Sequence, residues 1–425
     1  MKPLPWIAGV GVAIVLLACA QKASADELPA YDVMFKARLL PAEAMAQVSI
    51  EIIQASHVLR ALDLNAPASR YADFSGDGSI TVTNERVAWL PPETGGILRY
   101  TVAVDRLRGG VHDMRLTADW GVFRLDHLFP RANARTLVGA ESTSTLALEG
   151  PVDWSFETPY GPANDADKPV SVINTKRRFD RPMGWTIAGK LGIRRDRIAE
   201  RRVAVAAPVN TGFRRQDTLA FLRWTLPTLI DIFPTFPSRL LVVGSGEKMW
   251  RGGLSAPASL YMHPTRPLIS GNATSTLLHE LVHVAIATPA AQGDDWIVEG
   301  LAEYYSLEIL RRSGGISERR FEDAFEHLAQ WSTREGGRLT DPSSGANTAY
   351  AAGVMQRIAA DLQSVGQSLD TVVQGLIDTA ASTGALDREA LKAEIERAGG
   401  SSTIPGNLES LDLVTNPTSD REIRE

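Results

Sequence analysis

The chain has 425 residues, of which 44% are hydrophobic and 22% charged, and its formal net charge is −6. This acidic balance argues against a nucleic-acid partner, and the composition is ordinary for a globular protein. A single hydrophobic core rarely grows beyond about 250 to 300 residues, so the length predicts two folded domains plus the chain ends.

Residues 1–25 predict an export signal. Lys2 is followed by an apolar run from Trp6 to Leu17, which is too short to span a membrane comfortably. The run ends in Leu-Leu-Ala-Cys at positions 16–19, which resembles the lipobox of bacterial lipoproteins, whose cysteine is acylated and becomes the mature N-terminus. Cys19 is the only cysteine of the chain, as expected for a thiol that carries a lipid and forms no internal disulfide.

Cleavage after Ala25 is the alternative, because residues 23–25 fit an ordinary signal-peptidase site and Cys19 would then be discarded. If Cys19 is lipidated, Ala20 favours the outer membrane by resemblance to enterobacterial sorting. We therefore expect a bacterial cell-envelope location. The protein would be a lipoprotein facing the periplasm, or a soluble periplasmic or secreted protein.

Residues 26–172 are expected to form a β-sandwich, because short alternating segments are separated by turn sequences and helical periodicity is nearly absent. The expected strands include residues 33–39, 48–53, 79–82, 99–104 and 143–148. Residues 73–78 have the spacing of a calcium-binding loop. They lack the glutamate that such a loop needs, so a hairpin turn is favoured there.

Residues 176–202 contain ten lysines and arginines. This segment could bind an anionic partner, but Asp180, Asp196 and Glu200 are interspersed in it. That mixture favours a solvated face with local ion pairs.

Strands at 202–206 and 239–243 are expected on either side of a helix at 218–233, which should kink at Pro227. Long helical patterns run from Ala273 to about Arg397, and the polar residues 401–425 predict a weakly ordered tail.

Two histidines four positions apart, His279 and His283, lie on an otherwise apolar helical pattern that Asn272 or Thr274 could cap. Residues at i and i+4 project from one face of a helix, so both imidazoles can reach a single zinc ion. Glu280 stands where a carboxylate can take a proton from water activated by the metal. A buried helix with core histidines is the alternative. A chance HExxH is expected in on the order of one such chain in a hundred.

A third ligand is expected in the next helix. After HExxH, the pattern Trp-x-x-Glu-Gly-x-x-x-Tyr at 296–304 resembles the aminopeptidase N and glycyl aminopeptidase groups of gluzincin metallopeptidases, in the peptidase MA-like superfamily. In those groups the glutamate before the glycine ligates zinc, which the resemblance places at Glu299. Glu303 lies on the same helix face and is the competing ligand; otherwise it is expected to orient a ligating histidine.

The spacing differs from that of the family. Fifteen residues separate His283 from Glu299, whereas relatives of aminopeptidase N usually have eighteen. Residues 288–295 contain proline, glycine and two acidic residues, so we expect a shortened loop between two antiparallel helices that leaves the ligand geometry intact.

Two further segments match the same families. Tyr350, in a helix expected to run to about Gln363, resembles a tyrosine whose hydroxyl stabilises the oxyanion; a buried tyrosine is the alternative.

Gly252, Gly253 and Leu254 resemble a Gly-rich edge strand, whose backbone could pair with an extended substrate; an ordinary Gly-Gly turn is the alternative. In relatives this strand ends in a glutamate that binds the amino group of the substrate. Ser255 stands at that position, so the aminopeptidase label does not transfer.

Together these features predict an α+β protein, with a β-sandwich at 26–172 followed by a thermolysin-like, mainly helical zinc peptidase domain at 173–400. It would hydrolyse peptide bonds of a peptide or protein substrate with one zinc ion, as an endopeptidase or with a restricted specificity. Its only membrane contact would be the lipid on Cys19. The alternatives are a catalytically inactive binding or assembly lipoprotein with the same fold, and a zinc hydrolase acting on a non-peptide amide or on cell-wall peptide.

Overall fold

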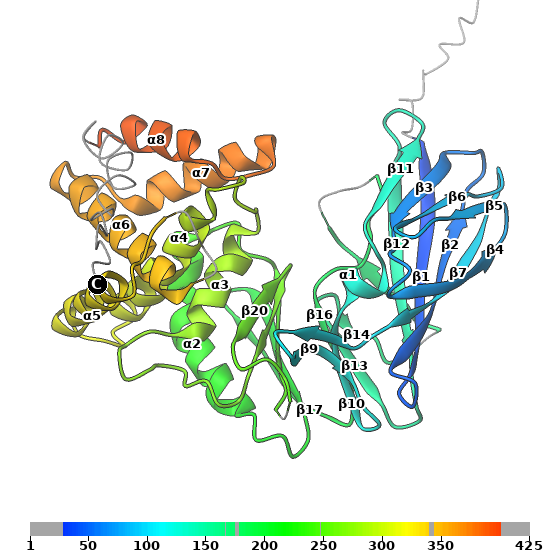
Figure 1. The fold of residues 1–425 in the computed structure, drawn as a ribbon, viewed down its shortest axis with the longest axis horizontal. Coiled ribbons are helices and arrows are strands. Elements are labelled where there is room, and N and C mark those ends of the chain that lie inside the picture. The colour runs from blue at the N-terminus through cyan, green and yellow to red at the C-terminus, as the bar shows by residue number, and fades with distance from the viewer. Residues whose placement is uncertain (1–28, 166, 175–177, 247, 340–343, 401–425) are drawn as a thin grey trace, which may run out of the picture.

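The computed structural model of the chain describes residues 29–165, 167–174, 178–246, 248–339 and 344–400. The predicted signal segment with Cys19 and the predicted tail from residue 401 lie outside the described residues. Strands fill the first half of the chain and helices most of the second half, and the molecule is elongated with two lobes (Figure 1). The α+β class is confirmed, with a strand-rich N-terminal region.

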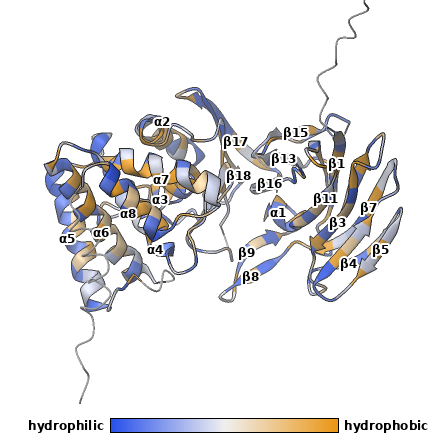
Figure 2. Ribbon diagram, turned by 90° about the horizontal axis from the view of Figure 1, so that it is seen from above, coloured by the Kyte–Doolittle hydropathy of each residue, from blue (hydrophilic) through white to orange (hydrophobic). Residues whose placement is uncertain are grey.

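Two sheets pack together in the strand-rich region and share one hydrophobic core. Buried residues alternate with more exposed ones along the central strands, as in β1 and β2, and both hydrophobic and hydrophilic residues are seen along β4 and β7 (Figure 2). The larger sheet has the order β15 (Val170–Val172), β12 (Glu141–Glu149), β1 (Ala30–Leu40), β2 (Met45–Ile53), β7 (Gly95–Ala103), β4 (Tyr71–Gly76). The smaller sheet has the order β11 (Ala132–Thr136), β3 (Leu59–Asn65), β6 (Arg86–Leu90), β5 (Ser79–Val82).

The segment at 73–78 is not the hairpin turn that the sequence favoured. β4 pairs with β7 and β5 pairs with β6, so the chain passes from one sheet to the other at this point. The carboxylates of Asp73 and Asp77 accept hydrogen bonds from the Thr101 hydroxyl (2.7 Å) and the Ile97 amide (2.9 Å). These two acidic residues therefore tie the corner to β7.

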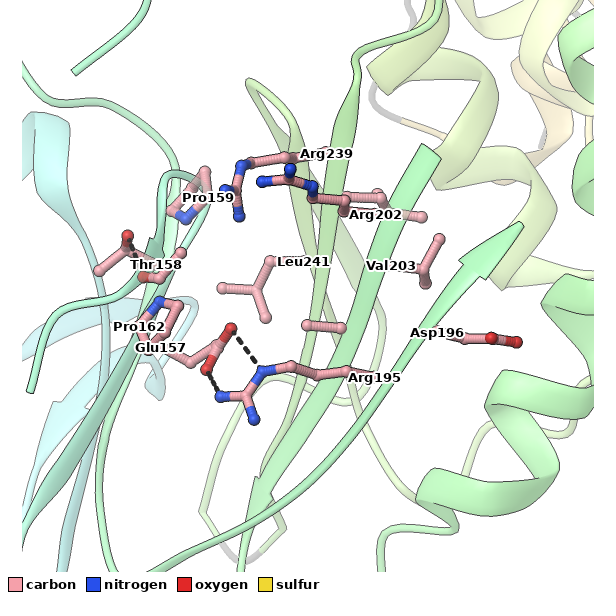
Figure 3. Close-up of a pocket in the computed structure, with 13 residues that line it drawn as sticks. Glu157, Thr158, Pro159, Pro162, Arg195, Asp196, Arg202, Val203, Arg239 and Leu241 are labelled. Atoms are coloured by element: carbon pink, nitrogen blue, oxygen red, sulfur yellow. Dashed lines mark hydrogen bonds and ion pairs between the residues drawn. The ribbon is translucent and has the colours of Figure 1, made fainter. Parts of the chain in front are cut away.

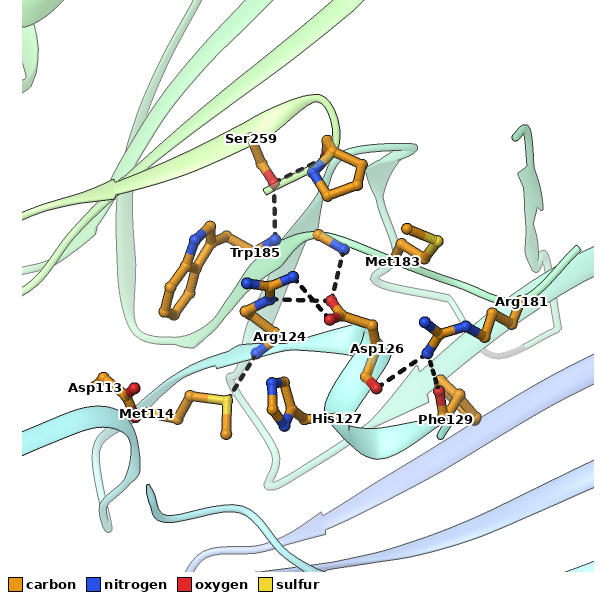
Figure 4. A network of polar contacts seen from close by, with 12 residues as sticks. Asp113, Met114, Arg124, Asp126, His127, Phe129, Arg181, Met183, Trp185 and Ser259 are labelled. Atoms are coloured by element: carbon orange, nitrogen blue, oxygen red, sulfur yellow. Dashed lines mark hydrogen bonds and ion pairs between the residues drawn. The ribbon is translucent and has the colours of Figure 1, made fainter. Parts of the chain in front are cut away.

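A third sheet connects the two lobes. Its order is β14 (Gly161–Pro162), β13 (Ser155–Thr158), β16 (Trp185–Gly189), β10 (Trp120–Arg124), β9 (Val111–Leu116), β8 (Arg106–Arg108), and the short helix α1 (Leu125–Leu128) follows β10. Strand pairing with the N-terminal region thus continues beyond residue 172, because β16 pairs with β10 and β13. At the junction the Trp185 amide donates to the Ser259 hydroxyl at 2.8 Å, and Asp126 links Arg124 to the Gly184 amide (Figure 4).

The fourth sheet has central strands that are buried on both faces. Its order is β17 (Leu191–Ile198), β18 (Arg201–Pro208), β19 (Arg239–Gly244), β21 (Ser259–Met262), β20 (Gly253–Ala256). Val205 and Val242 pack into the core formed with the helices, whereas Ala206 and Val243 pack into the core of the strand-rich region. Double burial explains why β18 is a nearly continuous apolar run.

Seven helices make up the rest of the described chain: α2 (Arg215–Ile232), α3 (Thr276–Ile286), α4 (Asp295–Arg312), α5 (Glu318–Arg334), α6 (Gly345–Ser364), α7 (Leu369–Thr383) and α8 (Arg388–Arg397). α2 contains Pro227 and begins three residues earlier than the sequence predicted. Among the described residues, none of the helices combines the length and apolar character needed to cross a membrane.

Candidate metal centre

Helix α3 presents His279 and His283 on one face. Its first turn is capped by Ser275, whose hydroxyl accepts the Leu278 amide at 3.3 Å. The cap is therefore neither Asn272 nor Thr274, the two residues that the sequence suggested. The helix ends at Ala287, which adopts a left-handed conformation (φ 53°), two residues before Pro289. Apolar residues on the remaining faces are buried and fix the orientation of α3.

Helix α4 brings Glu299 to the histidines. Residue 300 must be small, because a Cβ atom on Gly300 would lie 2.9 Å from the backbone of Ala351 in α6. The glycine after Glu299 thus allows α4 and α6 to cross closely. Tyr350 precedes Ala351 on α6, so it lies at the same helix crossing, where it is partly buried against the helical core.

Three potential ligand atoms converge on one point. The Nε2 atoms of His279 and His283 are 3.1 Å apart, and the carboxylate oxygens of Glu299 lie 3.4 Å from His279 Nε2 and 3.5 Å from His283 Nε2. Ligands at 2.0–2.1 Å in a tetrahedral zinc site would be separated by about 3.3 to 3.4 Å. The group could therefore hold a metal ion of this kind without rearrangement.

Glu303 contacts the opposite side of the His279 ring. Its carboxylate lies 3.0 Å from Nδ1, whereas the Glu299 carboxylate faces Nε2. A proton on Nδ1 can then be donated to Glu303, which leaves the Nε2 lone pair free for a metal. The Glu299 carboxylate thus lies among the potential ligand atoms. The Glu303 carboxylate lies on the other side of the His279 ring, next to Nδ1.

The charges around the centre favour a cation. Burial lowers the pKa of His279, but hydrogen bonds to Glu299 and Glu303 and the charge of Glu280 outweigh it and raise that pKa well above its usual range. For Glu299, burial raises the pKa and the two histidines outweigh burial, so that its pKa falls below its usual range. About 30% of the Glu299 side chain is exposed, so solvent reaches the centre from this side.

Glu280, the residue after His279, is buried against the edge of the fourth sheet. A Cβ atom on Gly253 would lie 2.4 Å from Cγ of Glu280 and 2.8 Å from its Oε1. Only a glycine leaves room for this carboxylate at its present position. The sequence pointed to Gly253 as a substrate-binding backbone and gave no sign of this packing role, because nothing in the local pattern links residue 253 to residue 280.

Strand β20 is the outer strand of its sheet and pairs only with β21 among the described residues. The His263 amide donates to the Gly252 carbonyl at 3.1 Å. In an antiparallel pair hydrogen-bonded residues alternate, so Gly253 and Ser255 direct their backbone groups away from β21. Gly253 and Leu254 therefore lie in the edge strand that the sequence predicted, with Ser255 on the same face as Gly253, whereas Gly252 lies immediately before this strand.

Comparison with known proteins supports the fold. No protein-family model matches the chain, and no curated protein matches it in sequence. Among solved structures, the chain is similar to the crystal structure of an aminopeptidase N family protein from Idiomarina loihiensis, with a TM-score of 0.67 and 16% sequence identity. The match covers 90% of this chain and 75% of that one.

Proposed function

We propose that this protein is a zinc-dependent peptidase. The convergence of His279, His283 and Glu299 carries the proposal, because their three ligand atoms have the separations of a tetrahedral site and Glu280 is buried beside them. The fold shared with an aminopeptidase N family protein supports peptide hydrolysis.

Each residue has a distinct proposed role. When bound, a zinc ion would supply Lewis acidity, polarising a carbonyl oxygen and lowering the pKa of water. The three ligands hold the ion, and Glu303 holds the proton of His279 on Nδ1. The Glu280 carboxylate takes a proton from the attacking water and passes it to the leaving amine, while the Tyr350 hydroxyl donates to the oxyanion.

The substrate proposal rests on β20. Its outward backbone groups at Gly253 and Ser255 can pair with an extended peptide, which needs no particular side chain. Ser255 offers no carboxylate to bind a free N-terminal ammonium. We therefore propose cleavage within peptides or a restricted specificity, in a protein exported to the cell envelope and anchored through Cys19 if the lipobox is used.

Metal analysis and hydrolysis of peptides would test the proposal together. The wild-type protein should bind one zinc ion, and Glu280→Gln should bind the same amount but hydrolyse peptides at least about 100-fold more slowly. Peptides with a blocked N-terminus should be cleaved as well as unblocked ones. Efficient release of single N-terminal residues from unblocked peptides would contradict the proposed specificity.

A catalytically inactive binding lipoprotein with this fold is the second candidate, and Ser255 is the observation that favours it. The two candidates differ in one measurement. Stoichiometric zinc without any hydrolysis that depends on Glu280 would exclude the enzyme and leave the binding protein.

A further inference from the structure

A cavity of about 310 Å³ lies between the third and fourth sheets, away from the metal centre (Figure 3). Its walls come from the β13–β14 hairpin on one side and from β17, β18 and β19 on the other. Three arginines line it, of which two come from the basic segment at 176–202. Neither the metal centre nor the proposed peptide site uses these residues.

Arg202 and Arg239 form a cationic pair at the rim of this cavity. They are direct partners in the parallel pairing of β18 with β19, so their side chains leave the same face of the sheet. Both guanidinium groups point toward Pro159 (Figure 3). Like charges directly opposite each other on neighbouring strands are destabilising. A negative charge placed between the two guanidinium groups would therefore stabilise this arrangement.

The nearby carboxylates supply that charge only in part, because each is paired with another arginine. Glu157 is buried and is paired through both oxygens with Arg195. Asp196 is paired with Arg223 and points away from the cavity (Figure 3). Within the described part of the chain, neither Arg202 nor Arg239 has a carboxylate or a side-chain hydrogen-bond partner. Burial and the charge of Arg202 lower the pKa of Arg239, although Glu157 raises it.

The cavity also has an apolar wall, which could contact the carbon skeleton of an organic ligand. Pro159, Pro162 and Leu241 contribute apolar surface beside the two guanidinium groups. Gly161 has a φ of +125°, and a Cβ atom there would lie 3.1 Å from Nη1 of Arg239, so a glycine keeps the approach to this arginine open. The cavity thus offers two adjacent cations next to an apolar wall.

We propose that this cavity binds an organic anion, whose carboxylate or phosphate is held between Arg202 and Arg239 and whose carbon skeleton lies on the two prolines and Leu241. The sequence favoured local ion pairs for the basic segment. That interpretation fits Arg195 and Arg197, which pair with Glu157 and Glu200, but not Arg202. Because the ligand touches β13–β14 as well as β18–β19, its binding also joins the two lobes of the molecule.

Calorimetric titration of the full chain with inorganic phosphate, phenyl phosphate and benzoate tests this site. We expect saturable binding that weakens with added salt, with phenyl phosphate binding more tightly than inorganic phosphate because the apolar wall adds to the contact. The relative affinity of benzoate and phenyl phosphate distinguishes a carboxylate site from a phosphate site. Arg239→Gln and Arg202→Gln should each weaken binding by roughly tenfold or more.

Arg194→Gln is the matched control, because Arg194 is an exposed neighbour of Arg195 that faces the other side of β17. It should leave the affinity unchanged. Without ligand, Arg239→Gln should unfold at the same or a higher temperature than the wild type, since one of two facing like charges is removed, and anions should no longer stabilise it. Absence of saturable binding to the wild type, or an unchanged affinity in both cavity variants, would overturn the proposal.

Discussion

Two histidines of this chain lie in opposite surroundings, one in each lobe. His279 is flanked by the carboxylates of Glu299 and Glu303. His127 is flanked by arginines, with Arg70 Nη1 3.0 Å from its Nδ1 and Arg106 Nη1 3.1 Å from its Nε2. Because both rings are largely buried, their charged neighbours distinguish them, and of the two only His279 has carboxylates against both ring nitrogens.

The pKa values express the same contrast. Burial and the neighbouring arginines lower the pKa of His127 to about 4, although Asp126 raises it. The carboxylates raise the pKa of His279 despite its burial. His127 belongs to the polar network beside the lobe junction, where Arg181 donates to the carbonyl oxygens of Asp126 and Phe129 (Figure 4). We infer a metal-binding role for His279 and a structural role for His127.

Removing one histidine from each setting should give the largest difference. His283→Ala removes a ligand atom, so zinc affinity should fall by more than about 1000-fold, beyond the roughly 10- to 100-fold cost of losing a group that only orients a ligand. His127→Gln should keep the zinc content of the wild type. Zinc content after dialysis against a chelator series measures both. Loss of zinc from His127→Gln, or retention of zinc by His283→Ala, would contradict the different roles inferred for the two histidine settings.

Gly253→Ala should separate catalysis from metal binding. The added Cβ atom would lie 2.4 Å from Cγ of Glu280, so the carboxylate must move, and a displacement of about 1 Å can cost on the order of 100-fold in rate. Zinc content should not change, because the three atoms nearest to the added Cβ atom all belong to Glu280, which is not one of the three proposed ligands. Peptide hydrolysis and metal analysis on the same preparation measure the two effects.

Gly271→Ala is the control for this variant, since a Cβ atom there meets no other atom within 4 Å. It should retain full activity. If Gly253→Ala is equally active, Glu280 does not depend on the edge strand for its position, and the proposed role of this glycine is wrong.

The sequence predicted those features that are periodic or local. The pair His279 and His283 follows from helical spacing, and the alternation of β1 and β2 predicted strands that the structure contains. The pairing of residues far apart could not be predicted in this way. The contact of Gly253 with Glu280 and the register of Arg202 with Arg239 depend on how sheets and helices pack, and no periodicity records that packing. The cap at Ser275 was missed because several capping residues precede α3.

Glu303→Gln should have a smaller effect on the metal centre. The amide can still contact Nδ1 of His279 but no longer holds its proton as a carboxylate does, so zinc affinity should fall by roughly 10- to 100-fold. Competition with a zinc chelator measures the change. Glu308→Gln, in the same helix but paired with Arg311 and Arg312, is the control and should leave zinc affinity unaltered. Equal affinities for wild type and Glu303→Gln would show that Glu303 does not support His279.

The smallest expected effect concerns pH and His127. The unfolded chain binds a proton on this residue below about pH 6.5, whereas the folded chain binds it only near pH 4, so folding stability should fall as the pH decreases through this window. The shift corresponds to about 3 kcal/mol, which solvent around the partly exposed ring should reduce to about 1 to 2 kcal/mol. The pKa of Asp126 is itself lowered, so its contribution is lost only at still lower pH.

Urea unfolding of the metal-free wild type and of His127→Gln, each at pH 7 and pH 5, measures the difference. The variant should lose less stability between the two pH values, because glutamine does not titrate, and contributions from the other histidines cancel in the comparison. A variant with the same pH dependence as the wild type would mean that His127 takes up its proton in the folded state as easily as in the unfolded one. The arginines would then not protect its ring, and the contrast with His279 would rest on the metal ligands alone.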